Sequence, residues 1–572
     1  MKCILSFVFL LQIFTVNAQG IIGSKKAINP YQYKIHAYHQ YQKSAVASAH
    51  PLASMVGAYM LGHGGNAFDA AIAMQLTLAV VYPGAGNIGG GGFMVARTTI
   101  GKTISLDYRE TAPAAASRDM YLDEKGNAQN NLSQYGHLAS GVPGTIAGLF
   151  ATLPYAKLTF KQLVQPAIDL AQNGFCITKN EAENLTKRQE NFKQFNTRPN
   201  ALMKVLWIEG DTLFQKDLAK TLVLIRDKGM KGFYEGETAK LIVEEMKRGN
   251  GLITLGDLKN YKTKQRVPIS FNYKGYTVVT MPPPSSGGIM IQQMLKMVEN
   301  RPLPGYGFET VKSVQLMTEV ERRAFADRAE HMGDPDFWKV PQSTLVSNAY
   351  LQKRMLDYDS TKSGKSADLK AGTIESTETT HISILDQYGN MVSVTTTLNG
   401  SYGSKTVVGG AGFLLNNEMD DFSTKPGVQN MYGAVGGEAN AIAPNKRMLS
   451  SMTPTLVLKG KQPFMVVGTP GGTTIPTSVF QIIVDIIDFK MKPLDAVRLP
   501  RFHHQWIPDE LLIEKDFSME VKTQLEQMGY KVRQYGIAGY EGSIGRVELL
   551  QKLNGKIEAV ADSRGDDTVA GY

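Results

Sequence analysis

A run of hydroxyl residues before a predicted hairpin contains the side chain best placed to act as a nucleophile. Residues 381–385 and 391–397 are rich in β-branched side chains, and a turn sequence with Gly389 separates them. Two such runs around a short Gly-containing turn are typical of a β-hairpin. The preceding residues, 359–380, are polar and contain Gly and Lys, which predicts an exposed loop. Thr379 therefore stands where a predicted loop meets a predicted core strand.

Cleavage of the peptide bond between Glu378 and Thr379 would turn Thr379 into a self-contained catalyst. A hydroxyl group is a weak nucleophile near neutral pH and needs an adjacent base. The α-amine of an N-terminal threonine has a reference pKa of about 8 and would lie beside the hydroxyl of the same residue. The simpler interpretation is that Thr377, Thr379 and Thr380 are ordinary β-forming residues at the start of a strand. The local sequence leaves both interpretations open.

Two further polar sequences could bind the charged groups of a substrate. Arg109 follows a strand predicted at residues 104–108, where its guanidinium could hold a carboxylate through two parallel hydrogen bonds, although a structural ion pair is the commoner role. Residues 418–421 contain three carboxylates at the end of a strand predicted from residue 409. Crowded carboxylates repel one another unless a cation is near. The cluster therefore fits either an ammonium site or a solvated turn.

A glycine pair before a predicted helix is the candidate for stabilising an oxyanion. Gly471 and Gly472 precede a helix predicted at residues 476–489. Unpaired N–H groups at a helix N-terminus bind anions, and no cationic residue adjoins this pair, which favours an acyl-transfer oxyanion over a phosphate.

Residues 426–443 are rich in glycine and include Tyr432, which predicts a long loop of the kind that closes over a site.

The elements that must position these residues are visible in the sequence pattern. Asn66 is predicted to cap a helix over residues 67–81, and glycines at 89–92 lead into a strand. Strands are also predicted at residues 455–458 and 463–467.

Composition places the chain among large globular proteins. It has 572 residues, of which 43% are hydrophobic and 20% charged, with a formal net charge of +9. This length predicts more than one domain or one large layered α/β unit. The basic residues are spread along the chain without a block interleaved with aromatic residues, so a solvated basic surface is favoured over nucleic-acid binding.

The N-terminus has the features of a secretory signal peptide. Lys2 supplies a positive charge, residues 4–14 are apolar, and residues 16–18 form a small-residue cleavage site. We therefore expect residues 1–18 to be removed and the mature chain to be periplasmic or secreted, with no membrane span. Cys176 would then be the only cysteine, which excludes an internal disulfide and a cysteine-based metal site. The histidines show no metal-ligand spacing, so no metal is expected.

Several short motifs, taken together and in order, resemble the γ-glutamyltransferase (glutathione hydrolase) family of the N-terminal nucleophile hydrolase superfamily. They span nearly the whole mature chain and lie at residues 107–113, 379–381, 397–399, 416–422, 449–452, 470–472 and 500–506. The resemblance implies an α/β fold in which two sheets lie between helical layers, an αββα sandwich. It also implies one precursor that cuts itself before Thr379 into residues 19–378 and 379–572, which stay associated as one intertwined unit.

The resemblance also implies a role for each candidate residue, with no cofactor. Thr379 would be the nucleophile, Thr397 would orient it, and Gly471 and Gly472 would form the oxyanion hole. Arg109 and Ser450 would hold the α-carboxylate of a γ-glutamyl group, and Tyr432 would belong to the lid. The residues around its α-amine would be Asn399, Glu418, Asp421 and Ser451.

The expected substrates are glutathione and other γ-glutamyl compounds, with water, amino acids or peptides as acceptors. Two alternatives remain. A cephalosporin (glutaryl) acylase of the same superfamily would accept side chains without an α-amine. A secreted amino-acid-binding protein would use the same arginine and carboxylates but would need no chain cleavage.

Overall fold

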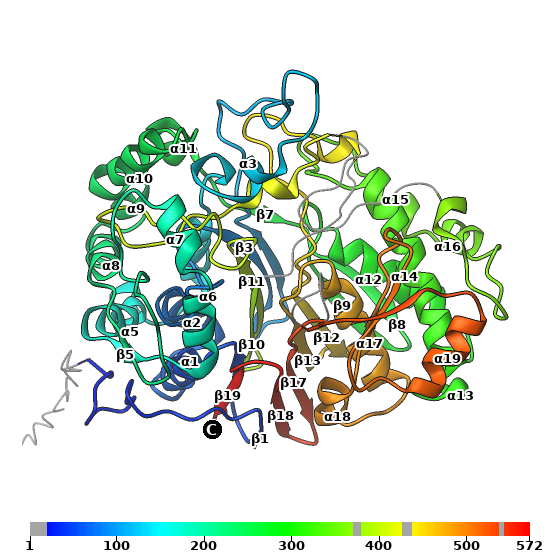
Figure 1. Cartoon of the computed structure of the whole chain (residues 1–572). Helices are drawn as coiled ribbons and strands as arrows, with labels where there is room; N and C mark the ends of the chain where they lie inside the picture. Colours follow the sequence, from blue (N-terminus) through cyan, green and yellow to red (C-terminus); the bar gives the residue numbers. More distant parts are fainter. Residues whose placement is uncertain (1–19, 370–378, 426–436, 537–542) are drawn as a thin grey trace, which may run out of the picture.

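Two seven-stranded antiparallel sheets stack face to face at the centre of the molecule (Figure 1). The computed structural model describes residues 20–369, 379–425, 437–536 and 543–572. The first sheet has the order β19 (Thr568–Gly571), β2 (Ala45–Ser48), β10 (Thr380–Leu385), β11 (Met391–Thr397), β3 (Gly91–Arg97), β4 (Thr103–Asp107) and β7 (Lys264–Arg266). The second has the order β1 (Tyr38–Tyr41), β18 (Lys556–Ala561), β17 (Glu548–Leu553), β13 (Gln462–Gly468), β12 (Thr455–Lys459), β9 (Tyr276–Thr280) and β8 (Ile269–Tyr273).

Helices cover the outer face of each sheet. α1 (Pro51–Gly62) and α2 (Ala67–Val81) pack on the first sheet, and α12 (Gly287–Glu299), α14 (Val311–His331) and α17 (Thr474–Ile487) pack on the second. A third apolar cluster fills the space between the sheets. These layers confirm the predicted αββα sandwich. Within the described ranges, no helix combines the length and apolarity needed to cross a membrane.

The remaining elements surround this sandwich. The other helices are α3 (Asn130–Gln134), α4 (Thr145–Thr152), α5 (Phe160–Asn173), α6 (Lys179–Lys187), α7 (Gln189–Phe195), α8 (Lys216–Lys228), α9 (Lys231–Tyr234), α10 (Gly236–Arg248), α11 (Leu255–Asn260), α13 (Leu303–Tyr306), α15 (Gln342–Leu345), α16 (Asn348–Arg354), α18 (Pro493–Arg498) and α19 (Met519–Gln527). The short strands are β5 (Phe175–Cys176), β6 (Thr212–Leu213), β14 (Phe502–His503), β15 (Leu511–Ile513) and β16 (Val532–Gln534).

The alternation of side chains in β10 and β11 decides where the threonines point. Ile382 and Val394 belong to the cluster packed on α1 and α2, whereas Met391 belongs to the cluster between the sheets. Successive residues of a strand face opposite sides. Thr397 is an even number of residues from Met391 and therefore faces the second sheet.

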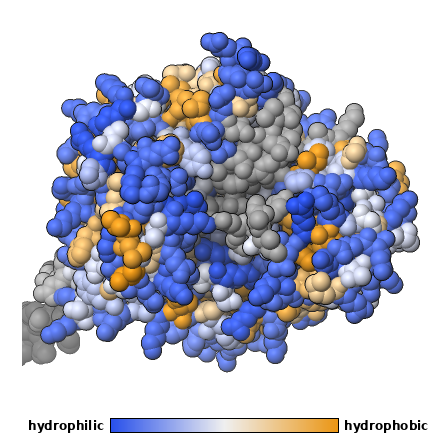
Figure 2. Space-filling view, viewed as in Figure 1, coloured by the Kyte–Doolittle hydropathy of each residue, from blue (hydrophilic) through white to orange (hydrophobic). Residues whose placement is uncertain are grey.

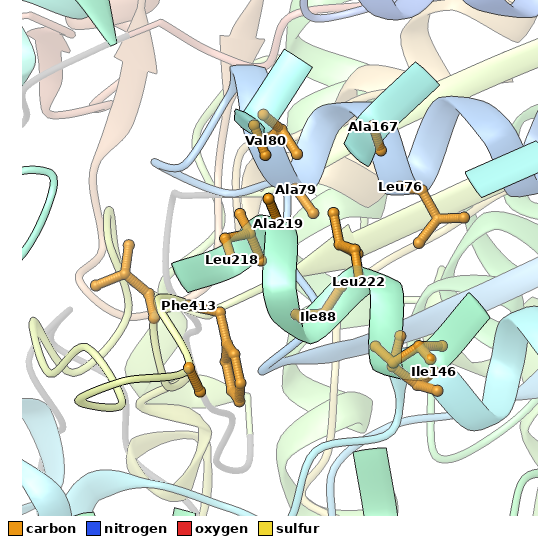
Figure 3. Close-up of a cluster of buried hydrophobic side chains, with 14 of the residues drawn as sticks. Leu76, Ala79, Val80, Ile88, Ile146, Ala167, Leu218, Ala219, Leu222 and Phe413 are labelled. Atoms are coloured by element: carbon orange, nitrogen blue, oxygen red, sulfur yellow. The ribbon is translucent and has the colours of Figure 1, made fainter. Parts of the chain in front are cut away.

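Apolar packing also holds the loop that carries the predicted acidic cluster. Phe413, from this loop, lies in the same cluster as Leu222 of α8, Ile146 of α4 and Ala79 of α2 (Figure 3). Phe413 therefore ties the chain just before the acidic cluster to the helices beside the first sheet.

Sequence patterns predicted the regular elements closely but failed in one loop. Asn66 and Asp69 form a reciprocal capping box at the start of α2, which has the predicted bounds. The strand predicted from residue 409 is wrong. Gly410 and Gly412 have φ angles of 82° and 78°, which break an extended conformation, so the described chain turns before it forms a short 3₁₀ helix at Glu418–Asp421.

Strands from before and after Thr379 are interleaved in both sheets. In the first sheet, β10 and β11 lie between β2 and β3, and in the second β12 pairs with β9. The two parts of the chain thus share hydrogen-bonded ladders and a common core.

Candidate active site

One pocket of about 210 Å³ collects most of the residues that the sequence analysis singled out. It is lined by Arg109, Thr379, Thr397, Asn399, Asp421, Ser450, Ser451, Met452, Gly472 and Ile475. Eight of these ten were predicted site residues. Met452 and Ile475 were not predicted as site residues, because an apolar side chain gives no local sign of binding or catalysis.

Strand register brings the two predicted catalytic threonines together. Thr380 of β10 pairs with Thr396 of β11, so Thr379 and Thr397 become neighbours at the ends of adjacent strands. The hydroxyl of Thr379 donates to Oγ1 of Thr397 at 3.5 Å, a long contact, and the backbone N–H of Asn399 donates to the same oxygen at 2.8 Å. Both threonines are buried. The Asn399 N–H thus orients the hydroxyl that faces Thr379.

The glycine pair forms a turn that only glycine fits easily. Gly471 and Gly472 have φ angles of 134° and 57° and directly precede the first turn of α17. A Cβ on Gly471 would lie 2.4 Å from Oγ1 of Thr474 and 3.1 Å from Cα of Gly545. Gly472 lines the pocket, so this helix N-terminus opens toward the same space as Thr379. Gly471, not among the lining residues, packs against Gly545.

Arg109 is the centre of a buried ion-pair cluster at the other end of the pocket. Its side chain is 1% exposed; one terminal nitrogen lies 2.5 Å from Oε2 of Glu418, and the other donates to Oδ2 of Asp421. The guanidinium also donates to the carbonyl oxygens of Met448 and Leu449, at 3.4 and 3.2 Å. The sequence assigned Arg109 and the two acids to opposite charges of a ligand, whereas in the structure they pair with one another. A zwitterionic ligand would offer each of them a partner of opposite charge.

Glu110 is a member of this cluster that the sequence analysis missed. It is fully buried, and its Oε2 lies 3.7 Å from a terminal nitrogen of Arg109. Burial raises the pKa of Glu110 to about 8, against the opposing effect of Arg109. The residue stands next to Arg109 in a motif, but neighbours in an extended chain usually face opposite sides, so spacing offered no reason to place both at one site.

The two predicted serines differ in how their hydroxyls are used. Oγ of Ser450 accepts a hydrogen bond from the N–H of Met452 at 3.2 Å. Oγ of Ser451 is buried and has no hydrogen-bond partner among the described residues. Ser286 holds this segment, because its N–H and its hydroxyl both donate to the carbonyl oxygen of Ser450. Ser451 therefore presents an unused hydroxyl to the pocket.

The histidine after the nucleophile joins the strands that carry the site. Nδ1 of His381 lies 2.9 Å from Oγ1 of Thr395, and Nε2 lies 3.2 Å from Oγ of Ser383. Burial lowers its pKa to about 3, so the ring is neutral. Gly468 of β13 packs against the ring so closely that a Cβ there would lie 2.1 Å from Cε1. His381 therefore connects β10, β11 and β13.

Two predicted site residues, Glu378 and Tyr432, lie outside the described residues, as does the expected signal peptide. The scissile bond and the lid therefore remain predictions. Among the described residues, no group of three or more His, Cys, Asp or Glu side chains is arranged to hold a metal ion.

Comparison with known proteins identifies the family. The model of the gamma-glutamyltranspeptidase family matches residues 53–572. The chain belongs to this family. The glutathione hydrolase proenzyme of Escherichia coli (strain K12) is 45% identical over 543 residues, which cover 93% of this chain and 92% of that protein.

Two solved structures extend the comparison. The gamma-glutamyltranspeptidase of Helicobacter pylori is 43% identical, with a TM-score of 0.55, and the match covers 56% of this chain and 94% of that chain. The cephalosporin acylase of Bacillus halodurans is 25% identical with a TM-score of 0.82, and the match covers 95% of this chain and 98% of that chain. The chain thus has the N-terminal nucleophile hydrolase fold of both structures.

Proposed function

We propose that this protein is a self-processing γ-glutamyltransferase with glutathione hydrolase activity. One observation carries the proposal: a threonine at the start of a central strand shares one buried pocket with an arginine and a carboxylate that suit the two charges of a glutamyl head group. The family membership and the similarity to a glutathione hydrolase proenzyme support it.

Processing would begin with attack of the Thr379 hydroxyl on the carbonyl carbon of Glu378. The peptide nitrogen leaves as the new α-amine of Thr379, and water then hydrolyses the ester to free the C-terminus of residues 19–378. The interleaved strands support lasting association of the two fragments, since separation would break ladders in both sheets.

Turnover would use the same hydroxyl on a γ-glutamyl substrate. The α-amine of Thr379 accepts the proton from its own Oγ1 as that oxygen attacks the γ-carbonyl carbon. Thr397 orients the hydroxyl through the 3.5 Å contact, and the N–H groups at Gly471 and Gly472 stabilise the oxyanion, a contribution of about 3 kcal/mol per donor in other acyl-transfer enzymes. The amine product leaves, and water releases glutamate or an amino acid or peptide accepts the acyl group.

Recognition of the glutamyl head would exchange the ion pairs already present. Arg109 and Ser450 bind the α-carboxylate, while Glu418, Asp421, Asn399 and Ser451 surround the α-ammonium. Both acids pair with Arg109 in this structure, so an incoming zwitterion replaces arginine–carboxylate contacts with new ones of the same type. This exchange limits the number of charges that binding leaves buried without a partner.

The acylase alternative is less favoured because of these acids. A glutaryl side chain has no α-amine, so its carboxylate would draw Arg109 away and leave Glu418 and Asp421 buried without a cation. The same pocket chemistry would serve a binding protein, but such a protein would stay uncut.

Two measurements test the proposal together. Denaturing gel electrophoresis of the purified protein should give two bands, and N-terminal sequencing of the smaller fragment should begin at Thr379. Hydrolysis of a γ-glutamyl anilide should accompany cleavage, whereas a glutaryl anilide should be a poor substrate. A fully active protein that remains one band would contradict the mechanism.

The location outside the cytoplasm belongs to the proposal as well. It rests on the sequence of residues 1–18. Sequencing of the larger fragment from cells should begin near Gln19, and a fragment that retains Met1 would contradict secretion by this route.

A further inference from the structure

The motif at residues 500–506 buries polar side chains that the proposed reaction does not use. Polar residues usually lie at the surface, and the face of the molecule in Figure 2 is mostly hydrophilic. His503, at the end of β14, is nevertheless fully buried, and Gln505 is only 5% exposed. Buried polar groups are normally hydrogen-bonded, so the partners of these two side chains show what the motif holds in place.

Gln505 binds the residue that follows the predicted oxyanion hole. Thr473 lies between Gly472 and the first residue of α17, and its hydroxyl donates to Oε1 of Gln505 at 2.9 Å. A threonine that precedes a helix usually accepts from an N–H of the first turn, but the side chain of Thr473 makes no such cap hydrogen bond. The hydroxyl of Thr473 therefore joins the start of α17 to the motif.

The turn formed by the two glycines is continuous with α17. The N–H groups of Thr474 and Ile475 donate to the carbonyl oxygens of Gly471 and Gly472, both at 3.1 Å. The hydroxyl of Thr474 also donates to the carbonyl oxygen of Gly471, at 2.8 Å. A displacement of the start of α17 would therefore move both glycines, whose N–H groups are the proposed oxyanion donors.

His503 fixes the side-chain amide of Gln505. Nε2 of His503 lies 2.8 Å from Oε1 of Gln505, and Nδ1 lies 2.8 Å from Oγ1 of Thr477. An amide oxygen only accepts hydrogen bonds, so Nε2 carries the proton. Burial lowers the pKa of His503 to about 3, which leaves Nδ1 of the neutral ring to accept from the hydroxyl of Thr477. Phe325 of α14 meets the imidazole ring at 86°, with 5.6 Å between the ring centroids, and so helps to hold its plane.

Three side chains on one face of α17 and its N-terminus bind this segment. Thr473, Thr477 and Gln481 are spaced by four residues, so they lie on the same side of the helix. The amide nitrogen of Gln481 donates to the carbonyl oxygen of Phe502 at 2.7 Å and to Oε1 of Glu321 at 3.0 Å. Of the three, Thr473 adjoins the glycine pair, whereas Gln481 lies about two turns further along the helix.

We propose that Gln505 is a positioning residue for the oxyanion hole, which acts by holding Thr473 and thereby the N–H groups of Gly471 and Gly472; the inference rests on the proposed function. Gln505 is not among the residues that line the pocket around Thr379. The oxyanion develops only as the γ-carbonyl carbon is attacked, so misplaced donors raise the barrier to reaction without weakening the binding of the glutamyl head group. The expected signature is a lower kcat with an unchanged KM.

Removal of either partner of the hydrogen bond tests the proposal. Gln505→Met keeps the length of the side chain and removes the acceptor, and Thr473→Val keeps the shape of the side chain and removes the hydroxyl. Hydrolysis of a γ-glutamyl anilide is measured for each variant and normalised to the amount of cleaved protein. The kcat should fall about ten- to hundredfold, less than for outright loss of an oxyanion donor, and the KM should stay within about twofold of wild type.

Two further variants test whether the residues act through this one contact. Because both single changes break the same hydrogen bond, the double variant Gln505→Met with Thr473→Val should lower kcat no further than the more severe single change. Thr473→Ser keeps the hydroxyl and should retain most of the wild-type kcat.

Gln481→Met is the matched control. It removes the same kind of side-chain amide from the same contact between α17 and the motif, but about two turns from the glycine pair. It should lower the melting temperature, because buried hydrogen bonds to Phe502 and Glu321 are lost, and it should leave kcat within about twofold of wild type.

The outcomes separate this inference from the function on which it rests. If kcat is unchanged in Gln505→Met and Thr473→Val, if their effects add in the double variant, or if Gln481→Met lowers kcat equally, Gln505 does not position the oxyanion hole. Failure of the wild-type protein to hydrolyse the anilide would instead overturn the proposed function itself.

Discussion

The two ends of the active-site pocket are stabilised in different ways. The reactive end uses the hydroxyls of Thr379 and Thr397 with the backbone N–H of Asn399, all within a single hairpin and the residues that flank it. The charged end joins Arg109 to Asp421, 312 residues further along the chain, through a buried ion pair. Removal of a side-chain hydroxyl at the reactive end should therefore stop cleavage and turnover. Removal of a charged side chain at the charged end should change both substrate binding and folding stability.

The largest expected effect is at the reactive end. Thr379→Ala removes the only atom able to attack in the proposed scheme, so the chain should stay uncut and activity should fall by a factor on the order of 10⁵ to 10⁶. Gel electrophoresis and the γ-glutamyl anilide assay measure the two effects. Thr380→Ala is the matched control, since the buried hydroxyl of Thr380 has no hydrogen-bond partner among the described residues. If Thr379→Ala were still cleaved, or if only Thr380→Ala stayed uncut, Thr379 would not be the nucleophile.

Arg109→Gln should affect both binding and folding. It leaves Glu418 and Asp421 as buried carboxylates without their cation, which costs about 3–5 kcal/mol of stability. The kcat/KM for a γ-glutamyl donor should fall about a hundredfold or more, since charge-assisted hydrogen bonds to the substrate are lost. Steady-state kinetics and urea unfolding measure the two changes.

The control for Arg109 is an arginine in an exposed ion pair. Arg118 pairs with Glu438 at 2.7 Å, and their side chains are 33% and 63% exposed. Exposed pairs are worth at most about 1 kcal/mol, so Arg118→Gln should change stability by less than that and leave kinetics unaltered. Equal losses in the two variants would contradict a special role for the buried cluster.

Glu110 predicts a pH dependence at the charged end. Its pKa is raised from 4.5 to about 8, so the unfolded chain releases this proton at lower pH than the folded protein. The contribution of the protonated Glu110 side chain to folding stability is fully present below pH 4.5, and it is lost as the pH rises through about 8. Glu110→Gln should therefore gain stability relative to wild type between pH 5 and pH 8. Urea unfolding at the two pH values checks this sign, and a difference independent of pH would contradict it.

The smallest expected effect concerns Ser451. Its hydroxyl has no protein partner among the described residues, so Ser451→Ala should leave thermal stability unchanged. It should raise the KM for the donor about fivefold, the loss of one hydrogen bond of about 1 kcal/mol. Ser450→Ala sharpens the contrast, because Oγ of Ser450 already accepts from Met452 and its removal should lower stability as well. A lower melting temperature in Ser451→Ala would argue against an unused hydroxyl.

Local patterns predicted the elements that depend on local interactions. The capping box at Asn66 and the hairpin around Gly389 involve residues close in sequence, and both are confirmed. The apolar residues after Gly409 predict a strand, but Gly410 and Gly412 interrupt it. The positive φ angles of the two glycines, together with the packing of Phe413 against helices, make this part of the chain turn.

The sequence by itself determined which residues could attack, orient and bind, and the order of its motifs indicated the family that the comparisons then established. Only the tertiary structure decided that Arg109 pairs with Glu418 and Asp421, and that Glu110 joins them. The physical reason is distance along the chain. Caps, turns and strands depend on residues within a few positions, whereas burial and ion pairing depend on how two sheets bring remote segments together.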